Sequence, residues 1–128
     1  MRNLILIALF AVACGDEPSP PPYTWGDASL SIAVAYCDAN YFCGASFGQV
    51  DDWYSRCERH VVFHLCELDE TCDTPLLDED EATVQACFDA LHGPTFQDPA
   101  SEDCYLLTFL GQVPEACRTA LDLNPTEP

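Results

Sequence analysis

The sequence predicts an all-α fold, a small disulfide-rich bundle of about four helices. Apolar residues recur at helical spacing, strand-like alternation is nearly absent, and nine cysteines occur in 128 residues. A chain of this length is expected to form one domain, and it is too short for the large barrel and dinucleotide-binding scaffolds. We place the helical domain at residues 27–123 and expect the tail, 124–128, to be disordered.

The first two helices are predicted by apolar residues that recur three or four positions apart. The apolar stripe of the first covers residues 30–41, and this helix ends at Gly44, since glycine commonly terminates a helix. The other begins with Asp51 or Asp52 as its N-cap and continues to Leu65, with its acids at the end that the helix dipole favours.

The third helix follows an acidic run. Residues 78–81 have the spacing of a capping box, an apolar stripe continues to Leu91, and Gly-Pro at 93–94 ends the helix. The fourth covers residues 101–110, and a short helical piece follows that Pro114 opens at its first turn.

The charge balance excludes one class of partner. Four Lys+Arg against 22 Asp+Glu give a formal net charge of −18, and lysine is absent. Nucleic-acid affinity comes largely from cationic side chains, so we expect no nucleic-acid partner. We interpret the acids as a solvated surface that resists aggregation. The alternative is adaptation to a saline environment, where salt screens the repulsion.

The first thirteen residues, 1–13, have the order of a secretory signal peptide. Arg2 precedes ten apolar residues, a run too short to span a bilayer. Residues 11–14, Ala-Val-Ala-Cys, then resemble the lipobox of bacterial lipoproteins, in which Cys14 becomes the lipidated first residue of the mature chain. By the same resemblance, Gly15 after the cysteine would permit sorting to an outer membrane.

The number of cysteines favours lipidation of Cys14. Without it an even set of eight remains, and all eight can pair in an oxidising compartment. The alternative is an ordinary signal cleaved near Ala13, which leaves Cys14 as a free thiol and therefore as a liability. The eight expected disulfide partners are Cys37, Cys43, Cys57, Cys66, Cys72, Cys87, Cys104 and Cys117.

A proline-rich stretch follows, and we interpret residues 14–26 as a lipidated cysteine and an extended tether. Prolines at this density favour a polyproline conformation that packs as neither helix nor sheet. The alternative is a proline-rich ligand for an aromatic groove, carried by residues 18–22. A spacer after a membrane anchor has the simpler mechanical role, because it holds the domain off the membrane.

The cysteine spacing repeats once. The pattern Cys-x5-Cys-x13-Cys from Cys37 is echoed as Cys-x5-Cys-x14-Cys from Cys66, which suggests two related helical hairpins. The echo makes the second and third cysteines of each copy partners, and it is one of many possible connectivities. The bonds it predicts are Cys43–Cys57, Cys72–Cys87, Cys104–Cys117 and Cys37–Cys66.

The whole pattern resembles a known group of proteins. The lipobox, the proline-rich tether, the C-x5-C spacing, and the sequences Ala86-Cys87 and Glu115-Ala116-Cys117 are similar to those of small cysteine-rich lipoproteins abundant in myxobacteria and related deltaproteobacteria. The resemblance implies a cell-envelope location and a disulfide-rich architecture. It transfers no active site.

Two histidines stand one helical turn apart. His60 and His64 have the i, i+4 spacing that lets two imidazoles bind one metal ion, with Cys57 and Glu67 nearby in sequence. A zinc-protease motif needs glutamate directly after the first histidine, where this chain has Val61. We therefore expect partly buried histidines bonded to their neighbours and no metal, and a metal-binding lipoprotein is the alternative.

A G-x-S-x-G motif surrounds Ser46. As a nucleophile elbow it needs a strand that turns sharply into a helix. Here it follows a predicted helix in a chain without a predicted sheet, so a small hydrolase using Ser46 is the least favoured hypothesis.

Aromatic residues concentrate in the N-terminal third of the domain. We expect them to pack in the core, and a sugar- or peptide-binding face is the alternative. They are Tyr23, Trp25, Tyr36, Tyr41, Phe42, Phe47, Trp53 and Tyr54.

The sequence therefore predicts a disulfide-stabilised lipoprotein of a bacterial cell envelope, on the periplasmic face or the surface of the outer membrane. We expect a non-catalytic binding or structural module without a cofactor. Its lipid anchor makes the membrane a partner, and a protein or glycan partner is not specified.

Overall fold

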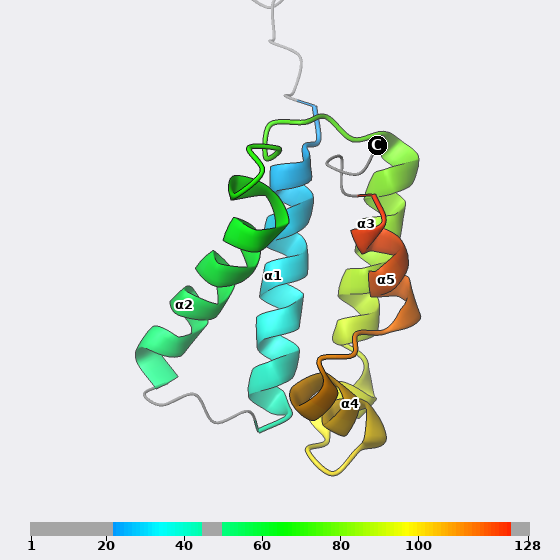
Figure 1. The fold of residues 1–128 in the computed structure, drawn as a ribbon. Helices are drawn as coiled ribbons and strands as arrows, with labels where there is room; N and C mark the ends of the chain where they lie inside the picture. The colour runs from blue at the N-terminus through cyan, green and yellow to red at the C-terminus, as the bar shows by residue number, and fades with distance from the viewer. Residues whose placement is uncertain (1–21, 45–49, 124–128) are drawn as a thin grey trace, which may run out of the picture.

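The computed structural model describes residues 22–44 and 50–123, and this part of the chain is all α-helical and disulfide-rich, as predicted (Figure 1). The residues described form no sheet, and their one isolated bridge joins Thr24 to Pro75. Short π-helical and 3-10 turns follow α2 and α3, at Phe63–Glu67 and Pro94–Gln97. The five α-helices are α1 (Trp25–Phe42), α2 (Val50–Val62), α3 (Asp78–Leu91), α4 (Glu102–Leu110) and α5 (Glu115–Leu121).

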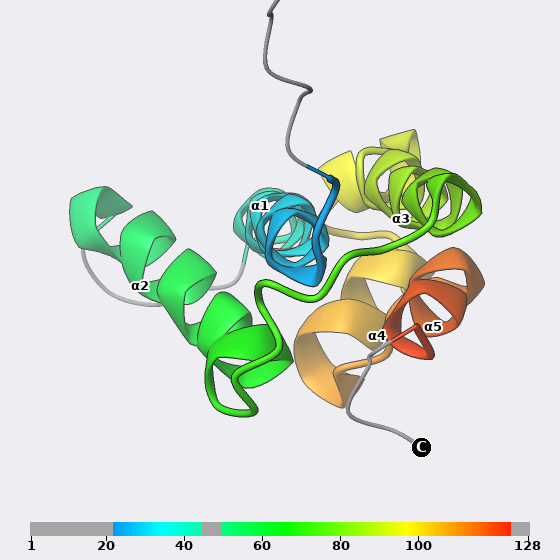
Figure 2. The same cartoon turned by 90° about the horizontal axis from the view of Figure 1, so that it is seen from above.

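Helix α1 is the centre of the molecule. Figure 2 shows α1 between α2 on one side and α3 on the other, with α5 beside α3. Buried alanines on α1 let neighbouring helices approach closely, with Ala28, Ala35 and Ala39 along one face and Ala33 on another. Trp25 is fully buried, and its indole Nε1 donates a 2.8 Å hydrogen bond to the carbonyl of Leu65.

The domain begins before residue 27, which corrects the predicted boundary of the tether at 14–26. Thr24 caps α1, because its hydroxyl accepts from the Asp27 N–H at 3.2 Å and its own N–H donates to the Asp27 carboxylate at 2.9 Å. Trp25 is therefore part of the first helical turn and of the core.

The segment that enters α3 crosses the start of α1. The N–H of Trp25 donates to the carbonyl of Thr74 at 2.8 Å, and the N–H of Gly26 donates to that of Cys72 at 2.7 Å. A Cβ at Gly26 would lie 2.8 Å from the Cys72 oxygen, so only glycine permits this approach. The crossing satisfies N–H groups that the first turn of a helix otherwise leaves open.

Two predicted helix starts differ in detail from the structure. Helix α2 begins at Val50, so Asp51 and Asp52 lie in its first turn rather than at its N-cap. At α3 the cap position is Leu77, whose N–H donates to the Asp80 carboxylate at 3.4 Å, and the capping box predicted at residues 78–81 is therefore one position too late.

The last two helices follow the prediction closely. The Ser101 hydroxyl accepts from the Cys104 N–H at 3.0 Å and caps α4, which ends at Gly111 in the left-handed conformation (φ 63°). Pro114 stands directly before α5, at its N-cap rather than in its first turn.

The eight cysteines from Cys37 to Cys117 form four disulfides, and none of the four predicted pairings occurs. The prediction assumed that each loop is clamped to its following helix in two equivalent halves. Instead, three bonds join segments that pack side by side and one closes a local turn, so the bonds of the two halves are not equivalent. The pairs are Cys37–Cys57, Cys43–Cys104, Cys66–Cys72 and Cys87–Cys117.

Candidate functional site

The main candidate site is an open hollow beside α1. It has a volume of about 310 Å³ and lies between α2 with its π-helical turn on one side and α3 and α5 on the other. We call it the apolar trough, since its lining is almost entirely apolar. Its lining residues are Ile32, Tyr36, His60, Val61, His64, Leu65, Leu91, Val113, Cys117 and Leu121.

A second hollow adjoins the apolar trough between α1 and α2. It measures about 450 Å³, and we call it the side hollow. The two share Tyr36, His60 and Val61, so they lie next to each other. Asn40, Trp53, Arg56 and Cys57 complete the lining of the side hollow.

Disulfides hold the walls of this surface. Cys37–Cys57 joins α1 to α2 next to the side hollow, and Cys87–Cys117 joins α3 to α5, with Cys117 in the trough lining. One bond thus fixes α2 to α1, and the other fixes α3 to α5 within the opposite wall. Such preorganisation lowers the ordering cost of binding.

His60 and His64 lie on the rim of the trough and are exposed, which corrects the expectation of partly buried histidines bonded to neighbours. Their rings are 4.4 Å apart, centroid to centroid, at an edge-to-face angle of 69°. Cys57 is bound to Cys37 and is no metal ligand. Among the residues described, no group of three or more His, Cys, Asp or Glu side chains is placed to hold a metal ion.

Basic residues are frequent in the segment that carries His60 and His64. Four of the six in the described part of the chain lie between residues 56 and 64: Arg56, Arg59, His60 and His64. Of these, His60 and His64 line the trough, Arg56 and His60 line the side hollow, and Arg59 lines neither. Arg56 forms an ion pair with Asp52 in which both side chains are more than half exposed. An exposed pair of this kind contributes little free energy and exchanges partners easily.

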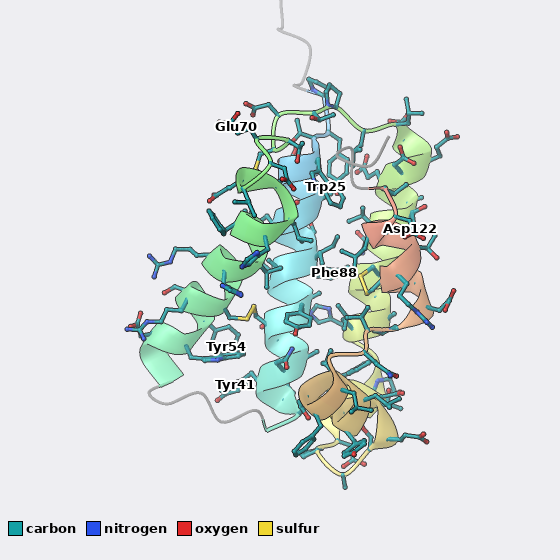
Figure 3. The ribbon with its side chains drawn as sticks, viewed as in Figure 1. Trp25, Tyr41, Tyr54, Glu70, Phe88 and Asp122 are labelled. Carbon is teal, nitrogen blue, oxygen red and sulfur yellow. A yellow bond between two sulfur atoms is a disulfide. The ribbon has the colours of Figure 1, made fainter. Side chains whose placement is uncertain are left out.

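Some of the predicted aromatic residues come together at the far end of α1 and α2. Tyr41 lies 5.2 Å from Tyr54 and 6.2 Å from Trp53, centroid to centroid, and Phe42 adjoins Tyr41 at 5.7 Å. Figure 3 shows Tyr41 and Tyr54 between the lower parts of the two helices. Trp25 is a core residue instead, as the core interpretation expected for it.

Sequence patterns gave no signal for a contact that joins three helices. His92 ends α3, with Nδ1 2.9 Å from the Phe88 carbonyl and Nε2 3.4 Å from the Asp38 carboxylate on α1. Its ring lies on Phe88, with the centroids 4.3 Å apart. Partial burial, followed by the charge and hydrogen bonding of Asp38, raises the pKa of the Tyr54 hydroxyl on α2. Asp38 on α1 therefore interacts with both His92 at the end of α3 and Tyr54 on α2.

Several sequence-predicted features fall outside the described residues. They are the signal peptide at 1–13, Cys14 with its lipobox, the tether up to residue 21, Ser46, Phe47 and the tail at 124–128. None of the helices in the described ranges has the length and apolarity needed to cross a membrane. Compared with known proteins, the chain matches no family, no curated protein and no solved structure.

Proposed function

We propose that this protein is a lipid-anchored, extracytoplasmic binding module of a bacterial cell envelope and that it performs no catalysis. Four disulfides favour an oxidising compartment, since thiols stay reduced in the cytosol. With eight cysteines paired, Cys14 is left over, and lipidation explains it.

The observation that carries the binding role is the apolar trough. A small domain normally closes apolar surface against itself, because burial drives its folding. Here an apolar hollow of about 310 Å³ stays open between walls that two disulfides fix. Ligand sites have this character, a largely apolar concavity with a few polar groups at its edge.

The uncharged fluorophore N-phenyl-1-naphthylamine, which brightens in apolar sites, tests the trough. We expect saturable fluorescence with the wild type and its loss in Val61→Asp, which places a charge where the trough and the side hollow meet. Leu77→Asp is the matched control, since Leu77 is 64% exposed and lines neither hollow. Equal fluorescence from both variants, or none from the wild type, would contradict a binding role.

The anchor has a separate test. In a bacterial host that processes lipoproteins, a clickable palmitate analogue should label the wild type and not Cys14→Ser, and only the wild type should remain with the membrane fraction. A mature chain whose Cys14 reacts with a maleimide before reduction would instead show the free thiol of an ordinary secreted protein.

Metal binding at His60 and His64 is the second candidate, favoured by the 4.4 Å ring separation and the exposure of both rings. It predicts one-site Zn²⁺ binding in calorimetry that His64→Ala abolishes. His92→Ala is the control, because His92 lies outside this rim. The hypothesis of a hydrolase using Ser46 keeps its own test, labelling by a fluorophosphonate probe.

A further inference from the structure

The trough and the side hollow are neighbours that differ in chemistry. The trough has room for about ten water-sized groups of roughly 30 Å³ each, on a lining that offers them almost no polar partner. The side hollow adds two residues with basic side chains, Arg56 and His60. A ligand that covers both hollows therefore needs a short apolar chain and a polar head.

The polar head of the ligand must accept hydrogen bonds, because the basic side chains of the side hollow are donors. Arginine has only donors, and a neutral or protonated imidazole offers at least one N–H. The Asn40 side-chain amide is already committed through its nitrogen to the Tyr36 carbonyl at 2.9 Å. A carboxylate accepts from all sides and pairs well with a guanidinium, so it complements this end of the surface.

We propose that the apolar trough and the side hollow bind a small amphipathic carboxylate, such as a medium-chain fatty acid. The aliphatic tail lies along the trough between Val61 and Leu121, and the carboxylate lies in the side hollow beside Arg56 and His60. This inference rests on the binding role proposed above and names the ligand class of that same site.

The net charge of the chain makes an anionic head group at this site more distinctive than a cationic one. A protein with a net charge of −18 attracts organic cations over most of its surface, without any need for a particular site. An anion is repelled least where basic groups lie, and two of them, Arg56 and His60, line the side hollow. The carboxylate takes the place of Asp52 beside Arg56, which costs little because that ion pair is exposed.

Calorimetry with the full-length chain carrying Cys14→Ser, disulfides intact, tests the proposal without detergent. We expect decanoate to bind at one site with a Kd on the order of 10 to 100 μM, the range open to a ligand of this size. Decyltrimethylammonium has the same tail and the opposite charge, and we expect at least about tenfold weaker binding at that site.

Two pairs of variants locate the head and the tail. Arg56→Gln should weaken decanoate binding about fivefold, whereas Arg118→Gln, the same change in a helical ion pair outside both hollows, should leave it within about twofold. Leu121→Trp fills the trough and should remove binding, while Leu110→Trp, at a 55% exposed position on α4, should not. Circular dichroism checks that each variant folds. If Leu121→Trp does not fold, the comparison of Arg56→Gln with Arg118→Gln decides whether the proposed site is correct.

The outcomes separate the two proposals. If decanoate and decyltrimethylammonium bind equally well and Arg56→Gln changes neither, the trough is a binding site but its ligand is not a carboxylate. If decanoate, the cation and N-phenyl-1-naphthylamine all fail to bind, the binding role itself is wrong. Decanoate binding that survives Leu121→Trp in a folded protein would place the ligand elsewhere and overturn the proposed site.

Discussion

Helices α1 and α2 pack side by side, yet they differ in what holds them in place. Nine residues of α1 are buried, from Trp25 to Asn40. None of the α2 residues whose side chains the structure describes, 52–62, is buried. Helix α1 is therefore part of a hydrophobic core with α3 and α5, whereas α2 lies against that core from outside.

Partly buried side chains such as Val62 and Leu65, together with a few specific bonds, hold α2 and the π-helical turn that follows it. Cys37–Cys57 fixes the helix to α1, Trp25 Nε1 holds the Leu65 carbonyl, and Cys66 packs in the core and closes a short loop with Cys72. The apolar trough lies at the edge of the hydrophobic core, between α2 with its π-helical turn and the core helices α3 and α5.

The largest effect is expected at Trp25, which serves both regions. Trp25→Ala removes a fully buried ring and the hydrogen bond to Leu65, and it should lower the free energy of unfolding by about 3 to 5 kcal/mol. Thermal denaturation measures the loss. Trp25→Phe, which keeps most of the ring, should cost less, and equal stability of the alanine variant and the wild type would contradict the assignment of Trp25 to the core.

Removal of one disulfide at a time should separate the two regions. Each of the bonds Cys37–Cys57 and Cys87–Cys117 contributes roughly 3 kcal/mol in the loop-entropy model, since they span 20 and 30 residues. In hydrogen exchange, the Cys37→Ser/Cys57→Ser variant should lose protection in α2 alone. The Cys87→Ser/Cys117→Ser variant should lose it in α3 and α5. Identical exchange patterns for the two variants would show that the molecule has no such division.

A smaller effect is expected at His92. His92→Ala removes the hydrogen bond to the Phe88 carbonyl, the contact with Asp38 and the ring packing on Phe88. The loss should be about 1 kcal/mol in urea denaturation, because the side chain is about one third exposed. His64→Ala is the matched control, and its exposed position predicts almost no change.

The smallest effect concerns the ionisation of Tyr54. Partial burial and the Asp38 carboxylate raise its pKa above the ordinary 10.0, so the native state holds the phenolic proton at a pH where the unfolded chain releases it. Stability from this group is therefore constant below pH 10 and falls as the pH rises above it. Asp38→Asn should lower the pKa of Tyr54, as followed by phenolate absorbance with Tyr54→Phe as the reference. An unchanged titration would exclude the contact.

The sequence predicted the helices well because their signals are local. Apolar spacing acts within one or two turns, and the helix predicted at residues 101–110 agrees closely with α4 at Glu102–Leu110. The start of α1 was missed because Trp25 follows a proline-rich stretch. Its burial depends on Leu65, 40 residues away in the chain.

The candidate site was predictable only in part. The spacing of His60 and His64 singled out the rim, but the stripe beside them predicted burial, whereas the structure leaves both exposed. The opposite wall of the trough comes from α3 and α5, with Leu121 at the end of the last helix. No local pattern relates these residues to α2.

Three properties can be read from the linear chain, because each depends on residue type and short-range spacing. They are the helical character, the potential of eight cysteines to pair and the concentration of basic residues at 56–64. Which cysteines pair is a tertiary matter. A disulfide forms only where two Cα atoms lie about 4.4 to 6.8 Å apart. The packing of α1 against α2, of the end of α1 against α4 and of α3 against α5 brings three pairs to 4.4–6.0 Å, and a local turn brings Cys66 and Cys72 to 4.8 Å. The same packing leaves the trough open, since α2 is fixed to α1 without meeting α5 along its length.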